Sequence, residues 1–524
     1  MSMINNYFTY NYVILLKMYK SIIAVAFLFL SQNLLAQNKA DISRPNIIFI
    51  YADDMGIGDV SHTTGKAATP NIDRLAAEGI RFTDTHTSSS VCTPSRYSLL
   101  TGRYNWRTTL SKGVINKPTM EPLIKKGETT VASLLKQANY HTAMVGKWHL
   151  GIRWELFPNY KKEKWQLGGG WNIDYTKPAI TPTSNGFDYF YGIAASLDMP
   201  PYVYIENEKV TELPSVMNDP KIRSRKGPSA PSFKSGECLQ VFAEKSVDYI
   251  NERAEEKEPF FLYLPLTSPH TPIVPSEKWR GKSELGPYGD FLMETDWVVG
   301  QVLKALDKHN LAENTIVLFS TDNGCSPAAK IPALKRKGHS PSGNLRGNKA
   351  DIYEGGHRVP FIIRWPEVIE AGIKTDRLTC MTDFIATCSD ITGVKLDDAS
   401  GVDAISFLST LKNPKETNRE DIISHSINGS FAIRKGDWKL ALCPGSGGWS
   451  TPRAGKTPAG SPSLQLFNLS DDIAETTNLY DKYPEKVKEL TKLLQSYVDK
   501  GRSTSGENQK NDREVNIYAE DKAK

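Results

Sequence analysis

The sequence predicts an α/β protein with a smaller α+β unit toward its C-terminal end. Short apolar runs typical of buried strands alternate with segments of helical periodicity, and no internal repeat is visible. With 39% hydrophobic and 23% charged residues, the 524-residue chain has the composition of a globular protein with a large core. This composition excludes a disordered, collagen-like or low-complexity chain.

Four apolar runs are expected to be strands, and polar residues follow each of them. The runs cover residues 46–51, 142–145, 260–264 and 315–319. In an open α/β sheet, ligands bind beyond the carboxyl ends of the strands. One polar residue after a strand is usually a turn former, but several arriving together predict a functional site. In chain order these residues are Asp53, Asp54, Lys147, His149, His270, Asp322 and Asn323.

Helical spacing appears in the segments 69–79, 130–137 and 292–307. In the first of these, Thr69 suits the N-cap and Pro70 suits the first helical position, while Gly79 suits the end. These segments lie between the apolar runs or next to them, as helices do in an α/β fold.

The pattern changes after residue 420. Residues 431–440 predict a hairpin, residues 464–469 a further strand, and residues 484–497 an amphipathic helix. We therefore expect a main, catalytic domain over residues 43–420, a C-terminal subdomain over 421–500, and a polar tail over 501–524.

Residues 1–36 predict a secretory signal peptide. Lys17 and Lys20 precede an apolar run at 22–30, and Ala36 is a small residue at the expected cleavage point. This run is shorter than the roughly 20 residues of a membrane span, so a retained anchor is the weaker alternative. Met18 is an alternative start to Met1. The expected location is the periplasm or the exterior, with no stable membrane span.

Charge and cysteine content exclude some functions. A net charge of +5 is too small to indicate a nucleic-acid partner. The six cysteines show no CxxC spacing, which argues against a zinc ribbon, and they are too few for a disulfide scaffold. Cys380 and Cys388 could be bridged only if their geometry allows it.

The segment 91–103 predicts a short helix with a cysteine at its start. Thr93 can cap this helix with Pro94 at its first position, and Gly102 can end it. Cys92 would then lie where free N–H groups attract an anion, and Arg96 would lie one turn away. The alternative interpretation is a buried cysteine beside a structural arginine.

The same segment resembles the signature of the type I, formylglycine-dependent sulfatases, the arylsulfatase family of the alkaline-phosphatase-like superfamily. It reads CTPSRYSLLTGR from Cys92 to Arg103. The resemblance implies a large central mixed β-sheet flanked by helices, with a smaller C-terminal subdomain. Further segments resemble the motifs of this family in the same order along the chain; they are residues 53–56, 146–151, 268–270, 321–324 and 346–349.

The resemblance also implies a mechanism. A formylglycine-generating enzyme would oxidise Cys92 to formylglycine (3-oxoalanine), an aldehyde that hydrates to a diol. One hydroxyl would attack sulfur, and the other would let the sulfated intermediate collapse, which a serine could not do. Arg96 would hold the formylglycine and His149 would take the proton from the diol. His270, with Lys349, would protonate the leaving alcohol.

The predicted metal site is rich in oxygen. Asp53, Asp54, Asp322 and Asn323 offer oxygen ligands, and Cys92 would join them after its conversion. Hard oxygen donors suit Ca²⁺, or less well Mg²⁺, better than Zn²⁺.

The expected contacts with the sulfate group are cations and one hydroxyl. Lys147, Lys349 and His270 could neutralise charge on the sulfuryl oxygens. Ser196 resembles a sulfate-contacting polar residue of some relatives. Around the site, aromatic residues of the segment 154–175 are expected to be packing or lid residues. The basic loop 326–346 is expected either to be a solvated face or to bind an anionic polymer.

The expected function is an exported sulfuric ester hydrolase acting on a sulfated carbohydrate, such as an algal or host polysaccharide or its oligosaccharides. One alternative is a formylglycine-dependent phosphonate or phosphate ester hydrolase, which relative activity on the two ester types would separate. Another alternative is a non-catalytic relative that binds sulfated glycans, although such a binder would not need both His149 and His270.

Overall fold

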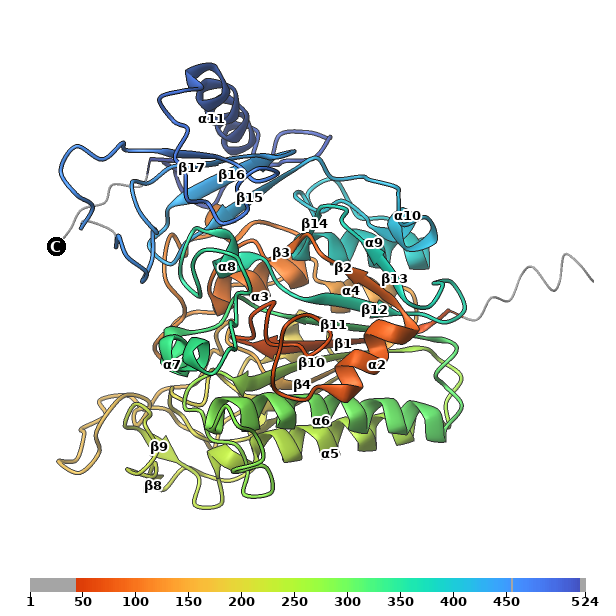
Figure 1. Ribbon diagram of the computed structural model, residues 1–524. Coiled ribbons are helices and arrows are strands. Elements are labelled where there is room, and N and C mark those ends of the chain that lie inside the picture. The colour runs from red at the N-terminus through yellow and green to blue at the C-terminus, as the bar shows by residue number, and fades with distance from the viewer. Residues whose placement is uncertain (1–43, 454–455, 519–524) are drawn as a thin grey trace, which may run out of the picture. The chain divides into compact units, whose positions relative to one another are not determined.

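The computed structural model describes residues 44–453 and 456–518, in which helices cover both faces of a ten-stranded mixed sheet (Figure 1). The predicted signal peptide, residues 1–36, lies outside the described residues. Within this described part of the chain, no helix has both the length and the apolar character that crossing a membrane requires.

The large sheet has the strand order β13, β2, β12, β11, β1, β10, β4, β5, β6, β7. The central strands β11, β1, β10 and β4 run parallel, whereas β12 is antiparallel to both β11 and β2. The predicted mixed α/β sheet is therefore confirmed, and its four predicted strands are neighbours. The bounds are β1 Asn46–Asp53, β2 Ile80–Phe82, β4 His141–Lys147, β5 Tyr189–Ile193, β6 Ile205–Glu206, β7 Lys209–Val210, β10 Phe260–Pro269, β11 Thr315–Thr321, β12 Phe361–Arg364 and β13 Ile373–Thr375.

Strand β1 shows why the sheet is covered on both faces. Ile47 and Phe49 belong to one hydrophobic core, and Ile48 and Ile50 belong to the other. Successive side chains of a strand point to opposite faces, so an uninterrupted apolar run must be buried twice.

Helices pack on both faces of the sheet (Figure 1). α2 begins at Pro70 after the N-cap residue Thr69, as predicted, although the Thr69 hydroxyl bonds to Ser61 rather than to the helix. α6 begins five residues earlier than the segment predicted from residue 292. On one face lie α2 Pro70–Glu78, α5 Cys238–Arg253 and α6 Pro287–Lys308; on the other lie α3 Cys92–Thr101, α4 Val131–Gln137 and α9 Phe384–Thr392.

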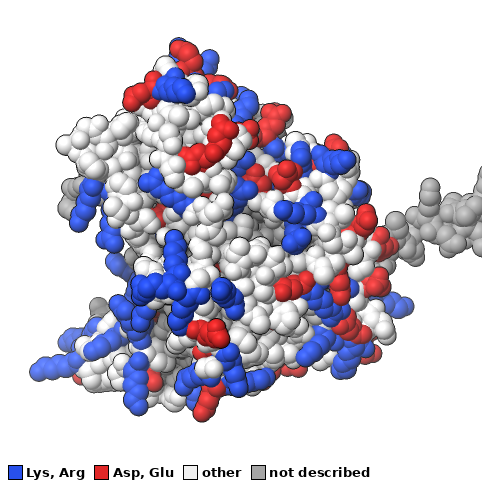
Figure 2. Space-filling model, in the orientation of Figure 1, with Lys and Arg blue, Asp and Glu red and all other residues white. Residues whose placement is uncertain are grey.

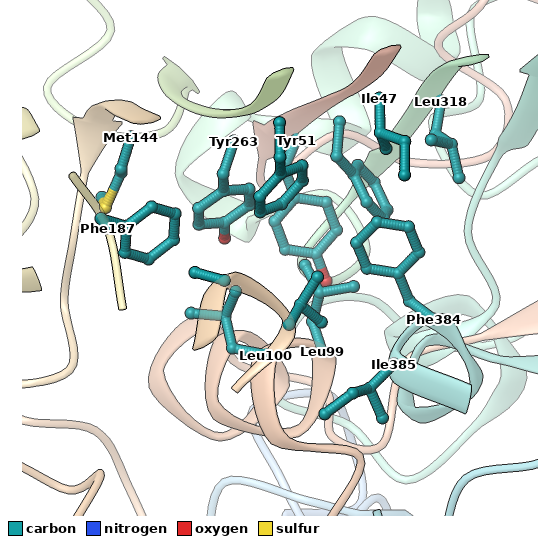
Figure 3. Close-up of a cluster of buried hydrophobic side chains, with 14 of the residues drawn as sticks. Ile47, Tyr51, Leu99, Leu100, Met144, Phe187, Tyr263, Leu318, Phe384 and Ile385 are labelled. Atoms are coloured by element: carbon teal, nitrogen blue, oxygen red, sulfur yellow. The ribbon is translucent and has the colours of Figure 1, made fainter. Parts of the chain in front are cut away.

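Helix α3 is held against the sheet by its leucines. Figure 3 shows Leu99 and Leu100 pointing toward the side-chain layer that includes Tyr51 and Tyr263. Burying a leucine stabilises the fold by about 1.5–3 kcal/mol, so these contacts fix where the first residue of α3 lies.

A four-stranded antiparallel sheet and α11 form the C-terminal region. Leu490, Leu494 and Val498 lie one helical turn apart and bury one face of α11 in the same core as the strands. Val515 and Ile517 of the segment expected as a polar tail belong to this core too. The bounds are β15 Asp421–His425, β16 Phe431–Lys435, β17 Trp438–Ala441, β18 Gln465–Asn468 and α11 Pro484–Asp499.

Short elements complete the described chain. They are β3 Thr85–His86, β8 Val216–Met217, β9 Pro228–Ser229, β14 Thr379–Cys380, α7 Ile331–Arg336, α8 Glu354–His357 and α10 Leu408–Lys412, with 3₁₀ turns at Asn105–Arg107, Pro182–Asn185, Ser235–Glu237, Pro327–Ala329 and Met381–Asp383.

Candidate active site

The carboxyl ends of the parallel strands bring the predicted polar residues to one edge of the sheet. Asp53 ends β1, Lys147 ends β4, and His270 directly follows β10. Asp322 directly follows β11. Because these strands are parallel neighbours, residues far apart in the sequence meet here.

Asp53 and Lys147 form a fully buried ion pair, with Lys147 Nζ 2.6 Å from Asp53 Oδ2. Burial raises the pKa of Asp53, but the charges of Lys147 and His270 outweigh it and hold this pKa well below its usual value. Gly146 precedes Lys147 with a φ of 135°, and a Cβ there would lie 2.0 Å from the carbonyl oxygen of Pro265. Only glycine allows this approach between β4 and β10.

Asp54 contacts residues of two other predicted motifs, the segments 321–324 and 346–349. Its φ of 67° is in the left-handed region, which aspartate tolerates better than most residues. Lys349 Nζ lies 2.5 Å from Asp54 Oδ1, and Asn323 Nδ2 donates to the same oxygen at 2.7 Å. The Asp54 N–H donates to Asp322 Oδ1 at 3.1 Å. Asp54 therefore links the end of β1 to the segment after β11 and to Lys349.

Cys92 is the first residue of α3, and the N-cap is Val91. The expectation that Thr93 caps this helix is wrong, because its hydroxyl donates instead to the His149 carbonyl oxygen at 3.0 Å. Gly102 ends the helix in a left-handed conformation, as predicted. Cys92 is buried, and Lys349 Nζ lies 3.8 Å from its Sγ. Its thiol thus lies at the positive end of α3, beside an ammonium group.

Arg96, one turn along α3, reaches back to the end of β11. Its Nε and Nη2 both donate to Asp322 Oδ2, at 3.0 and 2.7 Å. Burial and the charge of Asp53 raise the pKa of Asp322 to about 7. Arg96 Nη2 also lies 3.7 Å from Asp53 Oδ1, so this guanidinium forms ion pairs with both carboxylates.

His149 is buried in a strained backbone conformation, with a φ of 60°. Such a φ costs a residue other than glycine on the order of 1 kcal/mol and is common at functional sites. Its Nε2 lies 2.8 Å from the Ile115 carbonyl oxygen, which can only accept, so Nε2 carries the proton. Burial and the charge of Lys147 hold the pKa of His149 well below its usual value. The neutral ring therefore presents an unprotonated Nδ1, which has no partner in the described chain.

His270 lies on the other side of Asp54, with Nε2 3.7 Å from Asp54 Oδ2. Its Nδ1 donates to the Thr271 carbonyl oxygen. Burial and Lys349 lower the pKa of His270, but the carboxylates of Asp54 and Asp53 outweigh them, so this pKa is raised. The ring is 7% exposed and can reach a ligand.

Ser196 is buried, and its Oγ has no hydrogen-bond partner among the described residues. In that part of the chain, no hydrogen bond joins it to the other predicted site residues. The nearest link runs through Ala194, whose carbonyl accepts from the His149 N–H at 3.0 Å.

The structure also shows a supporting pair that the sequence did not indicate. His339 Nε2 lies 2.7 Å from Asp59 Oδ1, and both side chains are fully buried. Tyr288 donates to the second oxygen of Asp59, which also accepts from the Gly56 N–H. His339 was expected in a basic loop, either solvated or over the site, and no sequence pattern connects it to Asp59. This pair ties the loop 326–346 to the segment after β1.

The aromatic segment 154–175 contains both packed and exposed tryptophans, and the cysteines are buried. Trp154 and Trp171 are packed against neighbours, whereas Trp165 is 53% exposed. All six cysteines are buried, and no disulfide joins Cys380 to Cys388.

A group of side chains at this edge fits a cation. Asp53, Asp54, Cys92 and His270 place one possible ligand atom each within 4.8 Å of one another. Within the described chain, Asp53 Oδ1, Asp54 Oδ2 and Asn323 Oδ1 are buried without a hydrogen-bond partner. Buried acceptors without donors are costly, and a hard cation is the group that would satisfy them. These side chains could therefore hold a divalent cation.

Comparisons with known proteins agree with this geometry. The family model described as Sulfatase matches residues 45–394. The chain is 33% identical over 515 residues to the N-acetylgalactosamine-6-O-sulfatase of Bacteroides thetaiotaomicron, covering 89% of this chain and 95% of that protein. It is 32% identical over 483 residues to arylsulfatase A of Bos taurus, covering 88% of each. A solved structure of a 6S-sulfatase, described with the metabolism of multiple glycosaminoglycans by Bacteroides thetaiotaomicron, matches with a TM-score of 0.75 at 32% identity, covering 86% of this chain and 99% of that one.

Proposed function

The chain belongs to the sulfatase family, and from this premise we propose that it removes sulfate from a sulfated carbohydrate, using formylglycine made from Cys92 and one bound Ca²⁺. The observation that carries the proposal is the meeting of Cys92 with Asp53, Asp54 and His270 around one point. A thiol alone at a helix start would be ordinary, but a thiol among carboxylates with orphaned oxygens needs a chemical reason.

Cys92 Sγ stands where an oxygen of formylglycine would lie. When formed, the hydrated aldehyde supplies a hydroxyl that can attack sulfur and a second hydroxyl that lets the product leave. The N-terminal end of α3 favours negative charge at this position, and Lys349 Nζ is 3.8 Å away. Arg96, one turn along α3, is held in place by its ion pair with Asp322. These groups orient residue 92 and neutralise an oxyanion there.

The two histidines differ in protonation, as the proposed roles require. His149 has its proton on Nε2 and a free Nδ1, which suits it to take a proton from residue 92. His270 lies on the partly exposed side of Asp54, next to Lys349, which suits it to protonate a leaving alcohol. A sugar alcohol is a poor leaving group, so this protonation contributes substantially to the rate.

Asp53, Asp54, Asp322 and Asn323 are the residues that would hold the cation. When bound, Ca²⁺ would polarise a sulfate oxygen and orient the nucleophile. Lys147 and Lys349 would bind the remaining sulfate oxygens, together with His270 and Ser196. Each lysine forms an ion pair with a carboxylate in the buried site.

The substrate class rests on the relatives. One relative at 33% identity is an N-acetylgalactosamine-6-O-sulfatase, so 6-O-sulfated N-acetylgalactosamine, free or in a glycan, is the first substrate to test. Such polymers lie outside the bacterial cytoplasm, which agrees with export through residues 1–36. A formylglycine-generating enzyme would then be the maturation partner.

The test is peptide mass spectrometry across Cys92 on protein from its native host, combined with measurement of sulfate release. We expect formylglycine at residue 92 and sulfate release from the sulfated sugar, both abolished in the Cys92→Ala variant. An unmodified thiol in active protein would contradict the nucleophile. Faster cleavage of a matched phosphate or phosphonate ester would favour the hydrolase alternative. An unmodified, inactive protein that binds sulfated glycan would favour the binding alternative.

A further inference from the structure

A cavity of about 1000 Å³ is lined by residues that are neighbours in sequence of two predicted site residues. Thr271, the residue after His270, forms part of its wall, as does Asp198, two residues after Ser196. The lining also includes Lys330 at the start of α7, which follows the Asp322 segment in the chain. The cavity therefore touches three segments that also supply the predicted site.

The cavity wall carries an excess of positive charge. Only two of its lining residues are carboxylates, Asp198 and Asp219, and the latter accepts from the Lys221 N–H in a turn. Figure 2 shows Lys and Arg side chains concentrated on this face, where Figure 1 places α7. The cationic lining residues are Lys221, Arg223, Arg280, Lys330 and Lys337.

Several of these cations have no internal partner. In the part of the chain that the structure describes, no carboxylate forms an ion pair with Lys221, Arg223 or Lys330. Lys337, by contrast, donates to the Glu284 carbonyl oxygen at 2.6 Å. Lys330 has a φ of 60° and ends the 3₁₀ turn Pro327–Ala329 in a left-handed conformation. The unpaired cations converge on one concave surface, which raises the local potential for anions.

The rest of the wall suits a sugar. Ile222, Ile273 and Leu285 line the same cavity as the cations. Apolar walls with a few charged groups are typical of ligand sites, since the C–H faces of a ring and its anionic substituents need different surfaces. Asp198 Oδ1 is buried without a partner in the described chain and could accept from a hydroxyl or an amide N–H.

We propose that this cavity is a subsite for the sugar next to the cleaved sulfate ester, and that it selects substrates whose neighbouring sugar carries its own anionic group, a carboxylate or a second sulfate. This inference rests on the proposed function. If His270 protonates the leaving alcohol, the rest of the substrate lies on the His270 side of the site, and the next residue, Thr271, lines this cavity. Arg223 and Lys330 would pair with the neighbouring anion.

The test compares binding with turnover on the full-length, Ca²⁺-loaded protein. Binding is measured by calorimetry on the Cys92→Ala protein, which has no nucleophile at residue 92. The probes are a chondroitin 6-sulfate tetrasaccharide and the same tetrasaccharide with its carboxyl groups reduced to alcohols. The test variant is Arg223→Ala/Lys330→Ala, and the control is Lys335→Ala/Arg336→Ala. The control removes the same charge from exposed positions on α7 that do not line the cavity.

We expect the test variant to bind the native tetrasaccharide about tenfold more weakly, because it loses two ion pairs, and to bind the reduced one almost unchanged. The control should bind both probes like the parent protein. In otherwise unmodified, matured enzyme, the same test pair should raise KM for the native tetrasaccharide with little change in kcat. The uncharged pair Arg223→Gln/Lys330→Gln keeps more of the side-chain bulk than alanine and should repeat the result.

Equal affinity of the parent protein for both probes would overturn the proposal, as would equal weakening in test and control variants. If the binding pattern holds but no sulfate is released, the proposed function fails while the subsite stands. If sulfate is released but binding ignores the carboxylates, the subsite fails while the proposed function stands.

Discussion

Arg96 and Asp322, 226 residues apart in the chain, form a fully buried ion pair in which two guanidinium nitrogens donate to one carboxylate oxygen. The pair joins the first turn of α3, which presents Cys92, to the carboxyl end of β11. It therefore sets the position of the proposed nucleophile relative to the proposed cation site.

The Arg96→Ala variant should lose activity and a large part of its stability. Removing the guanidinium leaves Asp322 buried without its partner, which costs about 3–5 kcal/mol in comparable cases. Urea unfolding followed by circular dichroism measures the stability, and sulfate release measures the activity. Arg153→Ala is the matched control, because Arg153 and Glu121 form an exposed pair, and it should change stability by less than about 1 kcal/mol. An active, stable Arg96→Ala protein would contradict this role.

The His270→Ala variant should show a loss that depends on the leaving group. Loss of a general acid typically lowers the rate by roughly 10²–10⁴-fold, and we expect a loss of this size in kcat for a sugar sulfate. A nitrophenyl sulfate has a leaving group that needs no proton, so its cleavage should fall far less. The comparison of kcat for the two substrates decides the role, and equal losses would show that His270 binds sulfate instead. His309→Ala, on a partly exposed histidine, is the control.

Removal of divalent cations should abolish activity and lower the melting temperature. Without a cation, one oxygen each of Asp53, Asp54 and Asn323 stays buried without a hydrogen bond in the described chain. Ligand binding at 100 times its dissociation constant stabilises a fold by about 2.7 kcal/mol, so the shift should be measurable by calorimetry. Ca²⁺ should restore both properties better than Mg²⁺.

The Asp54→Ala variant should lose this response to Ca²⁺, whereas the exposed variant Asp376→Ala should retain it. Elemental analysis of the purified protein gives the stoichiometry, for which we expect one ion per chain. A melting temperature indifferent to chelator would contradict a Ca²⁺ site here.

Asp296 of α6 should make stability depend on pH. Its carboxylate accepts from the N–H groups of Asn71 and Ile72 at the start of α2, and from the Asn71 side chain. Burial nevertheless raises its pKa to about 6. A carboxyl group with a raised folded-state pKa binds its proton more tightly when folded. Its contribution is therefore complete below the unfolded pKa, near 3.8, and is lost as the pH rises through 6.

The Asp296→Asn variant removes this titration and can keep the contacts, because Asn71 can turn its amide to accept from the new one. Between pH 4 and pH 7, the parent protein should lose up to about 3 kcal/mol relative to the variant. Urea midpoints of both proteins at each pH measure the difference. A constant difference across this range would contradict the raised pKa.

Short sequence patterns were sufficient to predict a helix or strand where the residues of that segment alone determine it. The apolar run at 46–51 predicts a strand, and the structure buries it on both faces. Pro70 begins α2, as its position predicts, because proline suits the first helical residue, and Gly79 follows the last one. The N-cap predicted at Thr93 was wrong, because the Thr93 hydroxyl donates to the His149 carbonyl oxygen, which is remote in the sequence.

The sequence by itself determined the family, the strands, and which residue types could meet at one edge of the sheet. Their order along the chain and the parallel sheet made that meeting predictable. Only the tertiary structure decided the pairings: Lys147 with Asp53, Lys349 with Asp54, Arg96 with Asp322, and His339 with Asp59. Side-chain partners depend on distances between segments that are remote in sequence. No local propensity encodes those distances, which follow from how the helices and the sheet pack.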